Sequence, residues 1–205
     1  NGIIPSNIIG NQAFQKLSPV EMTSHLNQIS GVYVLSGALN TNRITIRGVG
    51  SRTPYGTDKI RLYYQGIPVT NGSGFSAIEA YDLENLNSIE VIKGPAARIF
   101  GQNAFTGAIN IVTKTNLNNS VSANLETGSF GQLNAGVTVG TELDNSSHII
   151  RVGKTTSEGY RNNPDYYNTN YFMKSVFNKK AQAIEMITTF SDRKFGAENF
   201  YTTNP

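Results

Sequence analysis

The segment from Asn87 to Lys114, NSIEVIKGPAARIFGQNAFTGAINIVTK, constrains the fold more than any other part of this 205-residue chain. Two runs within it, Ser88–Lys93 and Ala108–Lys114, alternate between apolar and other side chains, which predicts two β-strands. A Gly-Pro break, an Ala-rich helical turn and further glycines are expected to join these strands through sharp bends. The apolar side chains of both runs are predicted to bury one face of a small sheet: Ile89, Val91, Ile109 and Ile111.

A short amphipathic helix is expected upstream of these strands. Ser18–Glu21 reads as a capping box with proline at the first helical position. Met22, Leu26 and Ile29 then recur at helical spacing, and Gly31 is a suitable stop. Such an apolar stripe indicates a helix packed on a core.

The pattern changes after about residue 116, where strands and turns replace the mixed helix and strand signals. Alternating runs are predicted as strands at about 121–126, 133–139, 147–155, 169–179 and 183–192. Their lengths approach the ~9–11 residues with which a tilted strand crosses a bilayer. A soluble antiparallel sheet with one polar face fits the same alternation. In a membrane, an interfacial aromatic girdle is expected from Tyr160, Tyr166, Tyr167, Tyr171 and Phe172.

The residues offer little for catalysis or metal binding. The chain has no cysteine, and His25 and His148 lie far apart without carboxylates at metal-ligand spacing. Phosphate-binding and nucleophile motifs are absent from the sequence, so we predict neither an enzyme nor a cofactor. The net charge of +3 arises from scattered Lys and Arg, which argues against nucleic acid as a partner.

Charged side chains mark one face of the predicted strands. Alternation puts Ile44 and Ile46 inward, so Arg47 is expected to point outward. The same reasoning turns Glu90 outward. Arg47 and Glu90 are therefore predicted to share a face, as a cross-strand ion pair or as groups that meet another surface.

The segment 87–114 closely resembles the signature of the plug domain of TonB-dependent outer-membrane transporters. That pattern runs I-E-V-x-[RK]-G-P, an aromatic-Gly pair, Ala, Gly and I-N-I-x-T-K. Ile44–Gly48 is similar to the I-x-I-R-G strand of the family, and Ile60–Pro68 to the strand that ends Asp-Gly-hydrophobic-Pro, with Gln65 in place of Asp. Asn27–Val32 resembles the helix exit of the family. The resemblance covers about residues 15–114.

The resemblance implies a fold and a location. Residues 1–116 would form an α+β plug domain with a small mixed sheet that holds the strands 44–47, 60–65, 89–93 and 109–113. Residues 117–205 would be the N-terminal strands of an incomplete outer-membrane β-barrel of about 22 strands, in contact with lipid. The location implied is the bacterial outer membrane.

It also implies a function, namely TonB-dependent active import of a scarce solute. A ferric siderophore is the leading expectation, with cobalamin or haem as alternatives. A SusC-like glycan importer fits less well, because that branch reads K-D-A where this chain has Lys93–Pro95. A soluble β-rich binding module or adhesin would account only for the later strands. TonB contact is expected through an N-terminal segment that, with the signal peptide, would precede this chain.

Two sets of site residues follow from these expectations. The loops 49–58 and 70–77 would be ligand-facing plug apices, although plain connectors are equally compatible with their composition. The expected ligand contacts are Arg52, Tyr55, Phe75 and Tyr81. A lock between plug and barrel is expected from Arg47, Glu90 and Lys93, with lysine at the last position where arginine is common in the family.

Overall fold

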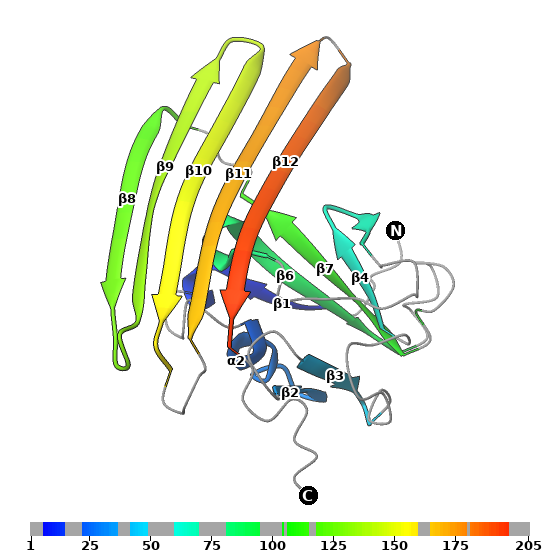
Figure 1. Ribbon diagram of the computed structural model, residues 1–205. Helices are drawn as coiled ribbons and strands as arrows, with labels where there is room; N and C mark the ends of the chain where they lie inside the picture. Colours follow the sequence, from blue (N-terminus) through cyan, green and yellow to red (C-terminus); the bar gives the residue numbers. More distant parts are fainter. Residues whose placement is uncertain are drawn as a thin grey trace, which may run out of the picture. The chain divides into compact units, whose positions relative to one another are not determined.

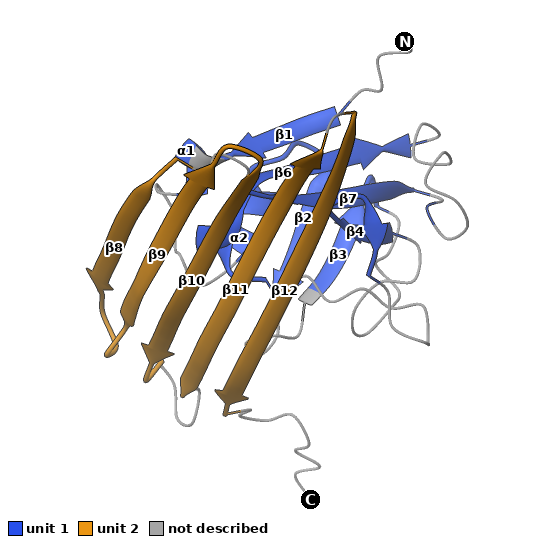
Figure 2. Ribbon diagram, turned by 90° about the horizontal axis from the view of Figure 1, so that it is seen from above, with its two compact units in different colours: residues 1–114 blue, residues 115–205 orange. Residues whose placement is uncertain are grey.

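The computed structural model describes residues 6–14, 22–36, 42–48, 60–69, 81–94, 104, 106–114, 118–159, 165–179 and 181–196. The chain divides into two compact units, unit 1 at residues 1–114 and unit 2 at residues 115–205 (Figure 2). The sequence had suggested a boundary between residues 116 and 117.

Unit 1 combines short helices with short strands (Figure 1). In chain order its elements are β1 (Ser6–Gly10), α1 (Asn11–Phe14), α2 (Met22–Leu26), β2 (Val32–Ser36), β3 (Asn42–Ile46), β4 (Ile60–Tyr64), β5 (Ile67–Pro68), the 3-10 turn η2 (Leu83–Asn85), β6 (Leu86–Lys93) and β7 (Gly107–Thr113).

A mixed sheet forms the centre of unit 1. Among the described residues, five strands pair in the order β1-β6-β7-β4-β5. All neighbours are antiparallel except β4 and β7, which run parallel. The predicted mixed sheet is therefore confirmed for the strands at 60–65, 89–93 and 109–113.

One face of this sheet carries the main hydrophobic core. The four side chains predicted to share a buried face are all 0% exposed: Ile89, Val91, Ile109 and Ile111. They belong to one cluster with Leu26 of α2 and Ile46 of β3, so the helix and the second sheet cover this face. Full burial of one such side chain is worth roughly 1.5–3 kcal/mol relative to its exposed state.

The strand at 44–47 does not join the mixed sheet, so this expectation is wrong. β3 pairs instead with β2 in a separate two-stranded antiparallel sheet, with Val32 opposite Ile46. Alternation correctly predicted that Ile44 and Ile46 are buried, at 2% and 0% exposure. However, the buried face of a strand does not specify which strand pairs with its edge.

The apolar stripe of the predicted helix is confirmed as core. Met22, Leu26 and Ile29 are 5%, 0% and 6% exposed. However, α2 ends at Leu26, so Ile29 and Gly31 lie in the turn that follows it, and the left-handed φ of +76° at Gly31 permits the bend into β2. The predicted capping box at 18–21 lies outside the described residues.

Unit 2 is an antiparallel meander of long strands (Figure 1). The strands are β8 (Ser120–Thr127), β9 (Leu133–Leu143), β10 (Ser146–Ser157), β11 (Tyr166–Lys179) and β12 (Gln182–Phe195). In the described part of this unit they pair in the order β12-β11-β10-β9-β8. The strands predicted from alternation are all present, and most extend beyond their predicted ends.

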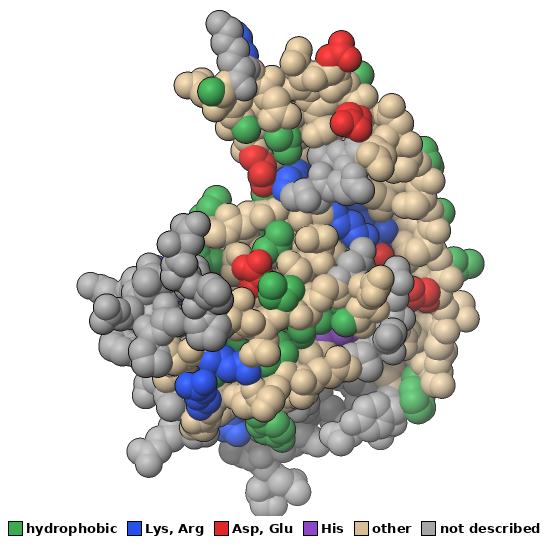
Figure 3. Space-filling view, turned by 180° about the vertical axis from the view of Figure 1, so that it is seen from behind, with side chains coloured by type: hydrophobic (Ala, Val, Ile, Leu, Met, Phe, Trp, Pro, Cys, Tyr) green, Lys and Arg blue, Asp and Glu red, His purple; other side chains and the backbone are tan. Residues whose placement is uncertain are grey.

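The two faces of the unit 2 sheet differ in polarity. One face presents exposed apolar side chains from every strand, among them Val121, Leu125, Val137, Val139, Ile150, Val152, Tyr171, Ile184 and Phe190. Figure 3 shows such hydrophobic side chains, in green, protruding along the right-hand edge of that view. The opposite face carries mostly polar and charged groups, including Asn134, Arg151, Asn168 and Lys174. This division is typical of a strand array with lipid on one side and a polar interior on the other.

The expected aromatic girdle needs a correction. Tyr167 and Tyr171 lie on the apolar face and are 50% and 47% exposed. Tyr166 and Phe172 alternate with them onto the polar face, where they are 4% and 3% exposed, and Tyr160 lies outside the described residues. The sequence identified aromatic residues but did not assign them to faces.

No helix among the described residues has the length and apolar character needed to span a membrane.

A matched glycine pair tests the packing of unit 1. A Cβ on Gly107 would lie 2.6 Å from Ile46 Cδ1 and 2.8 Å from the Ile92 carbonyl oxygen, whereas a Cβ on Gly10 would meet nothing within 4 Å. We expect Gly107→Ala to lower the free energy of unfolding of unit 1 by about 1–3 kcal/mol, because backbone cannot yield to the added methyl group. Hydrogen exchange of β6 and β7 amides during denaturant titration measures the change. Gly10→Ala is the control, and equal effects of both substitutions would contradict the packing described.

Candidate functional site

The structure describes one of the four predicted ligand contacts. Arg52, Tyr55 and Phe75 lie outside the described residues, so their role stays a prediction. Tyr81 is half-buried, and its ring stacks on Tyr64 with centroids 4.8 Å apart and planes at 18°.

This stacking gives Tyr81 a fixed base. Both rings pack against the main core cluster of unit 1, and Tyr64 is the last residue of β4. The aromatic ring of Tyr81 is thus held in a fixed position shortly after the predicted ligand-facing loop 70–77 in the sequence.

A tight turn links β4 to β5 immediately after Tyr64. Gln65 and Gly66 adopt φ of 52° and 75°, and Tyr64 pairs with Ile67. Positive φ at both central residues is typical of the type I′ hairpin turn. Asparagine or aspartate usually occupies the first of these positions, so glutamine here carries a conformational cost.

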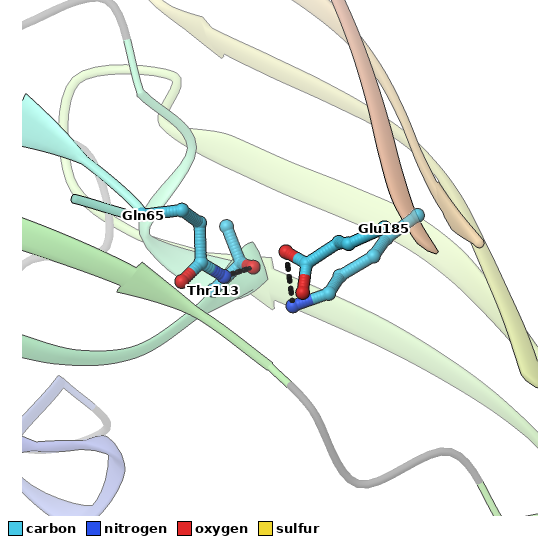
Figure 4. Close-up of polar contacts among 4 residues, drawn as sticks. Gln65, Thr113 and Glu185 are labelled. Carbon is cyan, nitrogen blue, oxygen red and sulfur yellow. Dashed lines mark hydrogen bonds and ion pairs between the residues drawn. The ribbon is translucent and has the colours of Figure 1, made fainter. Parts of the chain in front are cut away.

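Hydrogen bonds of Gln65 offset that cost. Its backbone N–H donates to the Ile111 carbonyl at 2.8 Å, and its side-chain Nε2 donates to Thr113 Oγ1 (Figure 4). The turn is therefore held against β7 by both the backbone and the side chain of Gln65. The sequence showed only that the aspartate of the family was missing at this position.

A second polar connection runs through Asn110 at the middle of β7. Its Oδ1 accepts from the Gly66 backbone N–H at 3.0 Å, and its Nδ2 donates to Glu90 Oε2 at 3.0 Å. Glu90 lies directly opposite Asn110 in the β6–β7 ladder. One amide side chain thus connects the β4–β5 turn with β6, and sequence reasoning had not singled it out.

The predicted cross-strand pair of Arg47 with Glu90 is not formed. Arg47 follows β3 in the two-stranded sheet, whereas Glu90 belongs to β6, whose neighbours are β1 and β7. Alternation made the two charges look equivalent, although they reside in different sheets.

Arg47 lies instead beside Lys93 and Gly94. Arg47 has a left-handed φ of 51°, and a Cβ on Gly94 would lie 2.9 Å from its Nη1. Lys93 Nζ donates to the Ser30 carbonyl, which anchors the end of β6 to the turn after α2. Partial burial lowers the pKa of Lys93, and the positive charge of Arg47 lowers it further. Two neighbouring cations of this kind favour an anionic partner.

The polar face of unit 2 carries charges that the sequence had not assigned. Lys174 is 0% exposed on the strand β11, between Ile149 and Ile187 on the neighbouring strands. Its Nζ lies 3.1 Å from Glu185 Oε1 (Figure 4). The sequence indicated this placement only through the alternation of side chains along β11, which puts Lys174 on the face opposite Tyr171.

Within the described ranges, no group of three or more His, Asp or Glu side chains converges as a metal site. His25 is buried against Phe14, with ring centroids 5.3 Å apart, and His148 contacts Ser146 and Ser175. His25 is thus a packed core histidine, and His148 is a half-buried residue that contacts two serine hydroxyl groups.

Comparison with known proteins identifies the relationship of the chain. A family model described as TonB-dependent receptor plug domain matches residues 3–108. The iron-regulated outer membrane virulence protein of Vibrio cholerae is 35% identical over 96 residues, which cover 46% of this chain and 15% of that protein. The match thus spans less than a fifth of that relative.

Solved structures share the fold across both units. The siderophore receptor PirA from Acinetobacter baumannii matches with a TM-score of 0.73 at 18% identity, over 93% of this chain and 32% of that one. The pyoverdine outer membrane receptor FpvA from Pseudomonas aeruginosa matches with a TM-score of 0.76 at 16% identity, over 92% of this chain and 27% of that one. The chain therefore has the α+β sheet and the following antiparallel strands of these receptors.

Asn110 provides a test of the polar connection in unit 1. We expect Asn110→Asp to destabilise unit 1 by about 1–3 kcal/mol, because it removes the donor to Glu90 and puts a second carboxylate beside it. Asn87→Asp adds the same charge at an exposed position of β6 and serves as the control. Urea denaturation monitored by exchange of the Gly66 amide measures both. Equal stability of the two variants would rule out the connection.

Proposed function

Because the chain belongs to the TonB-dependent receptor plug-domain family, we propose that the whole protein imports a ferric siderophore across the outer membrane with energy delivered through TonB. The match of the plug model over residues 3–108 is the observation that carries this proposal. Receptors of this family are transporters and not enzymes, and the protein is assigned to the bacterial outer membrane.

The choice of a ferric siderophore is supported by the similar proteins. One is an iron-regulated outer membrane protein, one is a siderophore receptor and one is a pyoverdine outer membrane receptor. Haem and cobalamin are the alternative cargoes. The polarity of the unit 2 sheet supports a membrane-embedded array, since a soluble module would expose a continuous apolar face to water.

Growth of a deletion strain on single nutrient sources tests the proposal. The strain should lose growth when a ferric siderophore is the sole iron source, and plasmid-borne wild type should restore it. Loss confined to haem, or to cobalamin-dependent growth, would select the alternative cargo. Undiminished growth on all of these sources would overturn the proposed import function.

We propose that the plug loops 49–58 and 70–77 contact the ligand. Arg52 offers a planar, permanently charged donor fork to anionic groups of a ferric chelate, and Tyr55 and Phe75 offer aromatic surface. Tyr81 is supported by its fixed stacking on Tyr64.

Alanine at Arg52, Tyr55, Phe75 or Tyr81 should weaken ligand binding roughly ten- to a hundred-fold, equivalent to about 1–3 kcal/mol. Ligand titration of the intact transporter measures this. Tyr81→Phe is the control, because it keeps the stacked ring and removes only the hydroxyl. Affinities within about two-fold of wild type for all four alanine variants would leave these loops as connectors.

The proposed lock involves Arg47, Lys93 and Glu90. The neighbouring cations Arg47 and Lys93 would meet carboxylates of the barrel, a contact that is strong when water is excluded. Glu90 supports the plug face through Asn110.

Arg47→Ala should raise passive leak of large antibiotics while it leaves ligand affinity unchanged, because it weakens docking and not the ligand site. Glu90→Ala should act in the same direction. Arg43→Ala, in β3 of the same sheet, is the matched control. Permeability and plug hydrogen exchange at wild-type levels in both variants would argue decisively against the lock.

A further inference from the structure

On the polar face of unit 2, the side chain of Arg151 connects three strands. Arg151 belongs to β10, and its Nη1 donates to Asn124 Oδ1 of β8 at 3.0 Å and to Thr138 Oγ1 of β9 at 3.1 Å. The residue is only 3% exposed. A buried guanidinium is stable only where its donors are met, so its position is specific.

The guanidinium rests on a glycine of the middle strand. A Cβ on Gly136 would lie 2.5 Å from Arg151 Nη2 and 2.8 Å from its Cζ, so any side chain at this position would displace it. Gly136 pairs directly with Gly153 of β10 and Asn124 of β8. The absence of a side chain at Gly136 therefore leaves open the space that the guanidinium fills.

Hydrophobic alternation alone does not fix the register of these strands. A shift by one residue would exchange the apolar and polar faces, but a shift by two preserves both. β9 and β10 pair from the rung Leu143–Ser146 to the rung Leu133–Thr156. The two-residue turn at Asp144 and Asn145 favours the native pairing at one end of this ladder. Within so long a ladder, an interaction that distinguishes the native register from one shifted by two adds to that preference.

Arg151 makes that distinction. In the native register Thr138 lies directly opposite it, and Gly136 lies at the diagonal position that receives the guanidinium. A two-residue shift in one direction brings Gly140 opposite and Thr138 to the diagonal. The shift in the other direction brings Gly136 opposite and Asn134 to the diagonal. Both shifts put a side chain where the guanidinium lies and remove the hydroxyl acceptor opposite it.

We propose that Arg151, seated on Gly136, acts together with the connecting turns to select the native register of β8, β9 and β10. Its contacts select one pairing among those that the apolar pattern allows. This role does not depend on which solute the receptor carries.

These 205 residues contain no cysteine, so a cysteine pair introduced among them reports their register through its own linked peptides. Val137 and Val152 are direct partners on the apolar face, so Val137→Cys with Val152→Cys reports the native register. Direct partners have Cα atoms about 4.5–5.5 Å apart, within the range that a disulfide bridges. Val139→Cys or Ala135→Cys, each with Val152→Cys, reports the two shifted registers, because diagonal partners are about 7–8 Å apart in the native one.

The full-length protein, refolded into detergent and oxidised, is examined by mass spectrometry of linked peptides. With Arg151 present, the native pair should dominate. In Arg151→Met, the ratio of shifted to native disulfide should rise about tenfold, which corresponds to about 1.4 kcal/mol. Gly136→Ala should cause a similar rise, because it displaces the same guanidinium. Lys154→Met, an exposed cation on the apolar face of the same strand, is the control and should leave the ratio unchanged.

Two results would overturn the proposal. The first is a native disulfide at wild-type yield in both Arg151→Met and Gly136→Ala. The second is loss of all three disulfides in these variants, because Arg151 would then be required for folding and not for register.

Discussion

The direct stacking of Ile89 on Ile111 and of Val91 on Ile109 across the β6–β7 ladder is the contact on which unit 1 depends. All four side chains are withdrawn from water, and the helix α2 and the strand β3 bury their own apolar residues in the same cluster. β7 also pairs on its other edge with β4, in parallel. The turn after β4 is therefore positioned relative to this one strand.

Side chains alternate with a two-residue period in the strands of both units, but the apolar side chains are mostly buried in unit 1 and mostly exposed in unit 2. In unit 1, one face of β6 and β7 is buried in the main hydrophobic core. On the other face, Ile92 of β6 and Ala108 of β7 are buried in a second, smaller cluster. In unit 2 alternation separates exposed apolar groups from a polar face. Apolar surface in contact with water is unfavourable by roughly 25 cal/mol per Å², so that arrangement is stable where lipid replaces water. This is why one chain can contain both a unit with a water-soluble type of core and a unit whose sheet has the reverse polarity.

Sequence reasoning succeeded where a single strand or helix carries its own signal. The strands β6 and β7, the buried face of each, the stripe of α2 and the meander of unit 2 were all predicted from spacing. It failed where partners had to be chosen: β3 was assigned to the wrong sheet, and β1, with only Ile9 buried, gave no pattern to detect. The connecting roles of Asn110 and Arg151 were also missed, since a hydrogen bond between residues 20 or 27 positions apart has no local signature.

Two departures from the family pattern show how the local structure adapts to a changed residue. Where aspartate is usual, Gln65 keeps the left-handed turn, and its longer side chain reaches Thr113 on β7. At the position where arginine is common in the family, the ammonium group of Lys93 donates a hydrogen bond to the Ser30 carbonyl. The planar guanidinium at this place is that of the neighbouring Arg47. In both cases the side chain that departs from the family pattern bonds to a segment distant in sequence, Gln65 to β7 and Lys93 to the turn after α2. The strands of this fold follow from local alternation, whereas such polar contacts depend on which segments the fold brings together.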